Sequence, residues 1–133
     1  MPTVIPDASI RDLQLLDEEF TRSIRLRDVS RLVELFYALD AQLQVPGVPP
    51  VDGAEAIKRY YAKAFETGLI DLRRESHQFE AENGLACAIG RYSRTCETQP
   101  GLLHTGHGHY IAVYRRQDDG RWRAIADSLS PSA

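Results

Sequence analysis

The fold is decided by residues 79–90, which read FEAENGLACAIG. A type I′ turn needs positive φ at both of its central residues, and Asn-Gly supplies this most readily. Asn83-Gly84 therefore predicts a tight hairpin between two strands at residues 72–81 and 85–96, the first of them polar and exposed. Further strands are expected beyond glycine-containing turns, at residues 105–116 and 122–130.

The first half of the chain has a helical pattern. Apolar residues recur there at three- and four-residue steps: Ile10, Leu13, Leu16, Phe20 and Ile24. This spacing predicts a helix over residues 8–26, and Asp28 is placed to cap a second, shorter helix. A short strand is expected at residues 41–45, followed by a third helix that Asp52-Gly53 opens and Gly68 ends. Three helices followed by long antiparallel strands are typical of an α+β fold in which a curved sheet encloses a pocket against the helices.

Length and charge restrict the class of protein. A chain of 133 residues predicts one domain, spanning residues 1–133. The net charge of −3 argues against nucleic acid as a partner, and no apolar run reaches the roughly 18 residues of a membrane span. The first residues do not have the pattern of a signal peptide, so we expect a cytoplasmic protein. Cys87 and Cys96 lie too far apart along one predicted strand to form a disulfide.

Four local phrases recur in a characteristic order: residues 28–32 (DVSRL), 35–41 (LFYALDA), 50–57 (PVDGAEAI) and 119–123 (DGRWR). In order and spacing they resemble the superfamily of ketosteroid isomerase, SnoaL-like polyketide cyclases and nuclear transport factor 2. The resemblance covers about residues 8–130. It implies a cone-shaped, cystatin-like α+β barrel, in which a curved antiparallel sheet packs on three N-terminal helices. Because this fold hosts many activities, the resemblance alone does not assign one.

The ketosteroid isomerase reaction does not fit these residues. That family places a catalytic Asp just before the Pro of its first strand, where this chain has Val45. Its two oxyanion donors, a Tyr and a protonated Asp, align on or near Phe20 and on Ala112. Since all three functional groups are missing, we do not expect steroid isomerisation by that mechanism.

SnoaL-like cyclases place a catalytic Asp late in the fold, and Asp127 matches it. If the last strand alternates regularly, Ile125, Asp127 and Leu129 share the face that looks into the cone. Partial burial there would raise the pKa of the carboxyl group and suit it to proton transfer. The alternative is a structural Asp that accepts hydrogen bonds at the end of a sheet.

Tyrosines are the other candidate site residues. Under the same alignment Tyr92, with Tyr60 or Tyr61, would hold a developing oxyanion beside Asp127. Gly90 would leave room for a ligand ring. The remaining expected contacts with substrate are the wall residues Tyr110, Ala112, Ile125 and Leu129, with Tyr37 near the rim. The alternative is that these aromatic residues are ordinary core with satisfied hydroxyl groups.

The histidines do not predict a metal site. His104, His107 and His109 match no standard ligand spacing, although the last two share a strand face. We expect no metal and no cofactor, and a surface or interface position for these side chains.

The outer face of the predicted sheet is too apolar to lie in water. Regular alternation assigns the following residues to it: Cys87, Ile89, Ile111, Val113, Trp122, Ala124 and Ala126. Because the helices can cover only one face, we predict a homodimer formed through the other, which the resemblance also implies.

Two functions remain open on the sequence. The first is a cofactor-independent isomerase, cyclase or dehydratase that acts by proton transfer on a small, mostly apolar metabolite. The second is a non-catalytic dimer that binds a small ligand or a partner. A cone filled by its own side chains favours the second; an open cavity where Asp127 meets two tyrosine hydroxyls favours the first.

Overall fold

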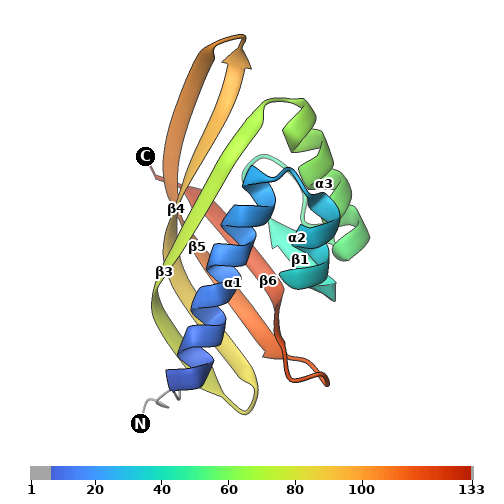
Figure 1. The fold of residues 1–133 in the computed structure, drawn as a ribbon, viewed down its shortest axis with the longest axis vertical. Helices are drawn as coiled ribbons and strands as arrows, with labels where there is room; N and C mark the ends of the chain where they lie inside the picture. The colour runs from blue at the N-terminus through green and yellow to red at the C-terminus, as the bar shows by residue number, and fades with distance from the viewer. Residues whose placement is uncertain (1–6, 133) are drawn as a thin grey trace.

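The computed structural model describes residues 7–132, which form three helices and one six-stranded sheet (Figure 1). The helices are α1 (Asp7–Arg25), α2 (Val29–Leu35) and α3 (Ala54–Glu66). The strands are β1 (Tyr37–Gln44), β2 (Val51–Asp52), β3 (Leu69–Glu82), β4 (Leu85–Gln99), β5 (Leu102–Arg116) and β6 (Trp122–Pro131).

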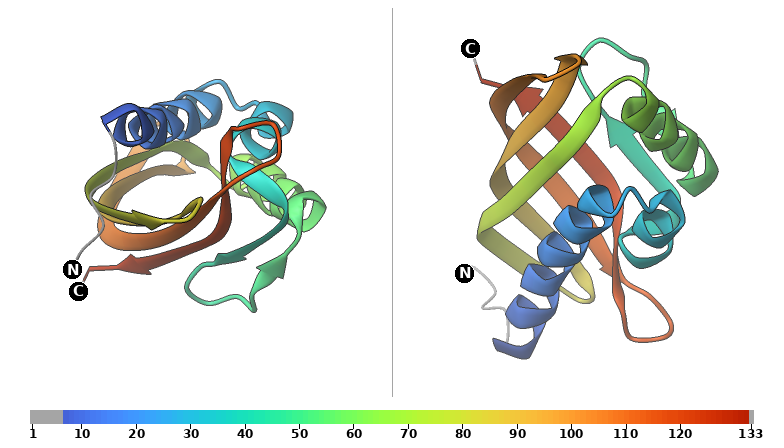
Figure 2. Two further views of the ribbon diagram at one scale, coloured as in Figure 1. Left: turned by 90° about the horizontal axis from the view of Figure 1, so that it is seen from below. Right: turned by 45° about the horizontal axis from the view of Figure 1, so that its top comes forward.

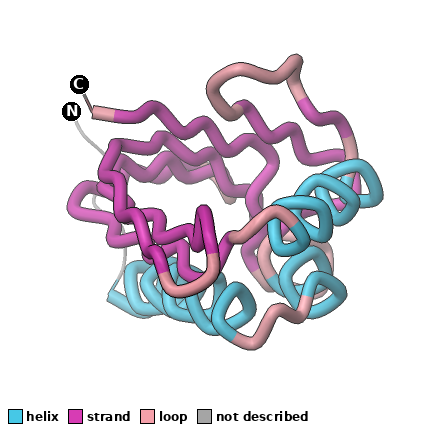
Figure 3. The backbone as a smooth tube through the Cα atoms, turned by 90° about the horizontal axis from the view of Figure 1, so that it is seen from above, coloured by secondary structure: helices cyan, strands magenta, loops and turns pink. Residues whose placement is uncertain are grey.

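The sheet has the order β2-β1-β6-β5-β4-β3. All its neighbours are antiparallel except β1 and β6, which are parallel. It curves strongly but does not close, since β2 and β3 are its two edges. The helices lie on one side of it, against the concave face (Figures 2 and 3). The expected α+β fold, a curved sheet packed on three helices, is therefore confirmed, and the sheet is open.

Local sequence signals determine the ends of several elements. The Asp28 carboxylate accepts a hydrogen bond from the Arg31 backbone N–H at 3.0 Å and so caps α2. Asn83 and Gly84 both have positive φ, 52° and 78°, as the predicted hairpin turn requires. Gly68 ends α3 at φ 118°, and a Cβ there would collide with the Glu97 backbone.

The strands are longer than predicted. β1 begins at Tyr37, not at residue 41, and β4 and β5 continue to a tight turn at residues 100–101. The resulting hairpin projects beyond α3 (Figure 1). The two-residue strand β2 was not predicted.

A β-bulge at Ile125 corrects the predicted faces of β6. Val113 pairs with Ala126, but the next residue, Tyr114, pairs with Ala124, so Ile125 is the extra residue. The bulge shifts the alternation of the strand by one residue. Ala124 consequently lies on the inner face with Tyr114, and Trp122 is also buried, whereas both were assigned to the outer face.

The core lies between the concave face of the sheet and the three helices. It includes Phe20, Phe36, Tyr61 and Tyr114, which are 0–1% exposed. Edge-to-face contacts join Phe20 to Phe36 and Phe36 to Tyr114, at 5.0 and 5.9 Å between ring centroids. Within the described residues, none of the helices has the length and apolar character to cross a membrane.

Candidate functional site

A buried ion pair occupies the centre of the cone. Arg74, on the inner face of β3, donates two hydrogen bonds to Asp127 of β6: Nη1 to Oδ2 at 3.0 Å and Nη2 to Oδ1 at 2.9 Å. Their side chains are 1% and 0% exposed. Charge-assisted bonds of this parallel kind fix both geometry and orientation, so neither group is free to rotate.

A second carboxylate reaches the same guanidinium from α1. Arg74 Nε lies 3.4 Å from Asp17 Oδ1, and Asp17 Oδ2 also accepts a hydrogen bond from the Ser76 backbone N–H at 3.1 Å. Burial raises the pKa of Asp17, and the charge of Arg74 opposes that rise. Two carboxylates therefore share one cation, and Asp17 has the poorer contact to it.

Tyrosine hydroxyls complete the network. Tyr37 donates to Asp127 Oδ2 at 2.8 Å, and the Tyr61 hydroxyl lies 3.2 Å from that of Tyr37. Burial, and then the charge of Asp127, raises the pKa of both phenols. The hydroxyl of Tyr110 bonds to the Ser76 hydroxyl and lies 3.4 Å from both Asp17 oxygens. Chiefly through burial, the pKa of Tyr110 rises to about 12.

Aromatic rings enclose the guanidinium on its flat sides. Arg74 Cζ lies 4.7 Å from the ring centroids of both Phe20 and Phe36 and 4.0 Å from that of Tyr110. Cation–π contacts with desolvated rings are stabilising. Burial lowers the pKa of Arg74, but the charge of Asp127, its hydrogen bonds and the nearby tyrosines together outweigh burial, and the pKa lies well above its usual value. Arg74 thus fills the space where a ligand would meet Asp127, Tyr37 and Tyr61.

The space expected above Gly90 is also filled, which corrects the prediction of room for a ligand ring there. A Cβ at Gly90 would lie 2.5 Å from the ring and hydroxyl of Tyr110, from the neighbouring strand. In the same way, a Cβ at Gly108 would lie 2.5 Å from the Tyr92 ring. The glycines accommodate the protein's own aromatic side chains.

The predicted pair of Asp127 and Tyr92 does not meet. Asp127 pairs with Ala112, which pairs with Ala88, and Tyr92 lies four residues further along β4. Two strand spacings and four residues separate their backbones by roughly 15 Å. Tyr92 lies instead toward the β4–β5 hairpin, and its pKa is raised by burial.

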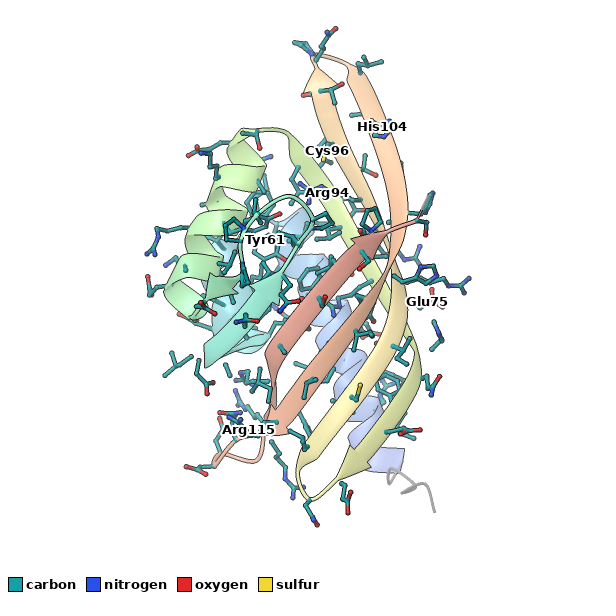
Figure 4. The ribbon with its side chains drawn as sticks, turned by 180° about the vertical axis from the view of Figure 1, so that it is seen from behind. Tyr61, Glu75, Arg94, Cys96, His104 and Arg115 are labelled. Carbon is teal, nitrogen blue, oxygen red and sulfur yellow. The ribbon has the colours of Figure 1, made fainter. Side chains whose placement is uncertain are left out.

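The remaining predicted contact residues are distributed between the core and its edge. Tyr37 is 2% exposed, so it is a core residue and not part of a rim. Ala112 and Leu129 are buried on the inner face, and Ile125 is half-buried at the bulge. The ring of Tyr60 contacts that of Tyr61 edge-to-face at 5.2 Å. Figure 4 shows Tyr61 between α3 and the sheet.

Two grooves flank α1 on the surface. One, of about 860 Å³, runs between α1 and β3, and Asp17 is among its lining residues. Arg74 also lines this groove, and Asp17 is the most exposed of the three charged members of the network, at 9%. The other, of about 540 Å³, lies between α1 and the β5–β6 turn and has Trp122 in its wall.

The histidines lie away from this network. His107 and His109 pair with Ser93 and Arg91 on the outer face, as their predicted common face requires. His104 of β5 is exposed and lies opposite Cys96 of β4. Within residues 7–132, no three His, Cys, Asp or Glu side chains gather in a metal-binding group.

Sequence reasoning missed Arg74 and Asp17. Residues 72–81 had been predicted as an exposed strand, but Leu72 and Arg74 are 2% and 5% exposed. A signal for Asp17 was present, because it follows Leu13 by four residues and precedes Phe20 by three, on the apolar face of α1. An acidic residue on that face indicates a buried partner of opposite charge.

Solved structures with this architecture are numerous. A ketosteroid isomerase-like protein from Erwinia carotovora atroseptica aligns with a TM-score of 0.84 at 16% identity, over 96% of this chain and 99% of the other. A candidate dehydratase of the nuclear transport factor 2-like family, from Streptomyces avermitilis, aligns at 0.82 and 18% identity, over 96% and 99%. A protein with a cystatin-like fold from Novosphingobium aromaticivorans aligns at 0.79 and 18% identity, over 93% and 82%. At these identities the likeness shows the fold alone.

No curated protein matches the sequence. The model of the SnoaL-like domain matches residues 18–125, which is well over half of the chain. The match includes all the residues of α2, α3 and β1 to β5. The chain therefore belongs to the SnoaL-like domain family.

Proposed function

We propose that this protein is a non-catalytic, dimer-forming binding module of the SnoaL-like family, in which the interior of the cone serves as a closed core. The observation that supports this most directly is the state of Asp127. Both of its oxygens are bound, by Arg74 and Tyr37, and its side chain is 0% exposed. A general base must reach the proton that it removes, and here the cation and the phenol occupy the directions of approach.

The tyrosines support the same proposal. A developing oxyanion needs hydroxyl donors that are free to turn toward it. Tyr37 already donates to Asp127, and the hydroxyls of Tyr61 and Tyr110 are bonded within the network. The ring of Tyr110 also fills the space above Gly90. The site groups therefore hold one another rather than an incoming molecule.

The outer face of the sheet supports the dimer. Ile111 is 53% exposed at its centre. Around it lie half-buried apolar residues on the same face, called here the Ile111 patch: Cys87, Ile89, Val113 and Ala126. No helix of residues 7–132 covers this face (Figure 4), and a second copy of the chain would remove its apolar surface from water.

A direct test asks whether the cone admits a ligand. 2-Naphthol, a neutral fused-ring probe, is titrated by fluorescence into the unmodified protein and into Phe20→Ala, which removes a ring from the centre of the cone. We expect saturable binding only by the variant, with near-UV circular dichroism to establish that it is folded. Saturable binding by the unmodified protein that Tyr61→Ala weakens would place a pocket inside the cone and overturn the proposal.

One observation favours a second function, a cofactor-independent isomerase, cyclase or dehydratase. Two carboxylates of unequal environment share Arg74, and the raised pKa of Asp17 would suit a proton donor that faces the groove between α1 and β3. Asp127 would then act as the acceptor. This function requires substrate to enter the cone by displacing Arg74. The 2-naphthol titration distinguishes it from the non-catalytic function, because only an enzyme of this kind would bind the probe inside the cone of the unmodified protein.

A further inference from the structure

Arg94, on the inner face of β4, is a second inward-facing arginine, and it has no anionic partner among the described residues. Arg94 is half-buried on the part of the strand that continues toward the hairpin turn. Figure 4 shows Arg94 and Cys96 between that hairpin and α3, with His104 on the adjacent strand. The ion pairs among the described residues involve four other arginines and not this one.

The guanidinium of Arg94 keeps unused donors. Its Nε donates to Cys96 Sγ at 3.4 Å, a weak acceptor. Burial lowers the pKa of Arg94, but hydrogen bonds with Cys96 and Tyr60 outweigh it and raise that pKa. Since a guanidinium carries five N–H donors, at least three remain free after these two neutral partners. Arg94 is therefore a permanent, partly desolvated cation with donors to spare.

There is open space beside this cation. Directly across from Arg94, on the same inner face, β5 has Gly106, and a Cβ there would meet nothing within 4 Å. This contrasts with Gly90 and Gly108, where aromatic rings fill the equivalent positions. His104, exposed and opposite Cys96, is the next inward residue along β5.

Two phenols adjoin the same region. Tyr92 precedes Arg94 by two residues on the same face and covers Gly108, and Tyr60 reaches Arg94 from α3. Tyrosine combines an apolar ring with a polar tip, a combination suited to ligands that have both kinds of surface. An exposed imidazole on the far side adds a further donor.

We propose that Arg94 binds the carboxylate of a small organic acid, whose apolar body lies over Gly106 and against Tyr60 and Tyr92. The planar guanidinium matches a carboxylate with two parallel hydrogen bonds, which a point charge cannot do. The proposal names small organic acids as the ligand class of the binding module proposed above, and it rests on that proposed function. The site lies on the hairpin side of the closed core and does not use the network around Arg74.

The test is a calorimetric titration of the full chain with benzoate, and with benzamide as a neutral analogue of the same shape. We expect benzoate to bind and benzamide to bind at least about tenfold more weakly, because loss of a hydrogen bond to a charged group reduces affinity by roughly 10- to 100-fold. Arg94→Met should reduce benzoate affinity by the same factor. Arg91→Met is the matched control, since Arg91 is exposed on the opposite face of the same strand.

A second variant keeps the test independent of the folding of Arg94→Met. Gly106→Leu leaves the cation in place and fills the open space, so it should also abolish benzoate binding. No benzoate binding by the unmodified protein, or binding of inorganic phosphate in its place, would overturn the assignment and leave the closed core untouched. Benzoate affinity that falls in Phe20→Ala but not in Arg94→Met would place the ligand in the cone and overturn both proposals.

Discussion

Arg74 and Asp127 form a bidentate ion pair at 2.9 and 3.0 Å in the centre of the cone, where their side chains are 1% and 0% exposed. The pair joins β3, an edge strand of the sheet, to β6, three strands away in the order of the sheet. The curvature of the sheet brings them together, so the contact holds the two sides of the cone against each other.

Asp127→Asn should lower the free energy of unfolding by about 3–5 kcal/mol, because it leaves a buried guanidinium with only the poorer contact to Asp17. Urea denaturation measures this. Asp40→Asn is the control, since its ion pair with Arg115 is exposed, and it should change stability by less than about 0.5 kcal/mol. Equal effects of the two substitutions would mean that the buried pair does not organise the core.

Asp17 should make stability depend on pH with a defined sign. Its pKa in the folded protein is raised above the ordinary value of 3.8, so the folded state binds this proton more tightly than the unfolded state. The stabilisation is present below the unfolded pKa and is lost as the pH rises through the folded pKa. Asp17→Asn removes this loss and leaves Arg74 and Asp127 as a balanced pair.

Denaturation of Asp17→Asn and the unmodified protein from pH 3 to pH 7 provides the measurement. The difference in unfolding free energy, variant minus unmodified, should become more positive as the pH rises. A difference that stays constant across this range would show that Asp17 titrates alike in both states.

Gly90→Ala should destabilise the fold by about 1–3 kcal/mol, because the new methyl group would collide with the Glu75 backbone carbonyl and lie 2.5 Å from the Tyr110 ring, so that both must shift. Gly106→Ala is the matched control on the next strand, where nothing lies within 4 Å, and should stay within about 0.5 kcal/mol of the unmodified protein. Thermal unfolding of the two variants compares them directly. A well-tolerated Gly90→Ala would mean that both the Tyr110 ring and the β3 backbone at Glu75 have room to move, as an adaptable pocket requires.

Ile111→Arg should dissociate the proposed dimer, because it places a charge in the centre of the Ile111 patch. Ile111 itself is 53% exposed in the single chain. Sedimentation equilibrium should give twice the chain mass for the unmodified protein and the chain mass for the variant. Ile70→Arg, at a partly exposed isoleucine on β3, should leave the dimer intact. A monomeric unmodified protein at micromolar concentration would contradict the proposal.

Features that depend on residues close together in the sequence were predicted correctly, whereas features that depend on pairing between distant strands were not. Asp28, Asn83 and Gly84 act on their immediate neighbours, and their predicted cap and turn are present. The faces of β6 were predicted only as far as its alternation is regular. The bulge at Ile125 arises from the pairing of β6 with β5, so the sequence of β6 alone does not predict it. For this reason Trp122 and Ala124 were assigned to the wrong face.

The candidate site follows the same division. The sequence by itself determined that Asp127 lies on the last strand, and the resemblance of its local phrases identified the family and the inward face. Only the tertiary structure decided that the side chain of Arg74 fills the centre of the cone. Arg74, Asp17 and Asp127 are distant along the chain and have little meaning singly, because a buried charge is stable only beside partners that the curvature of the sheet brings to it.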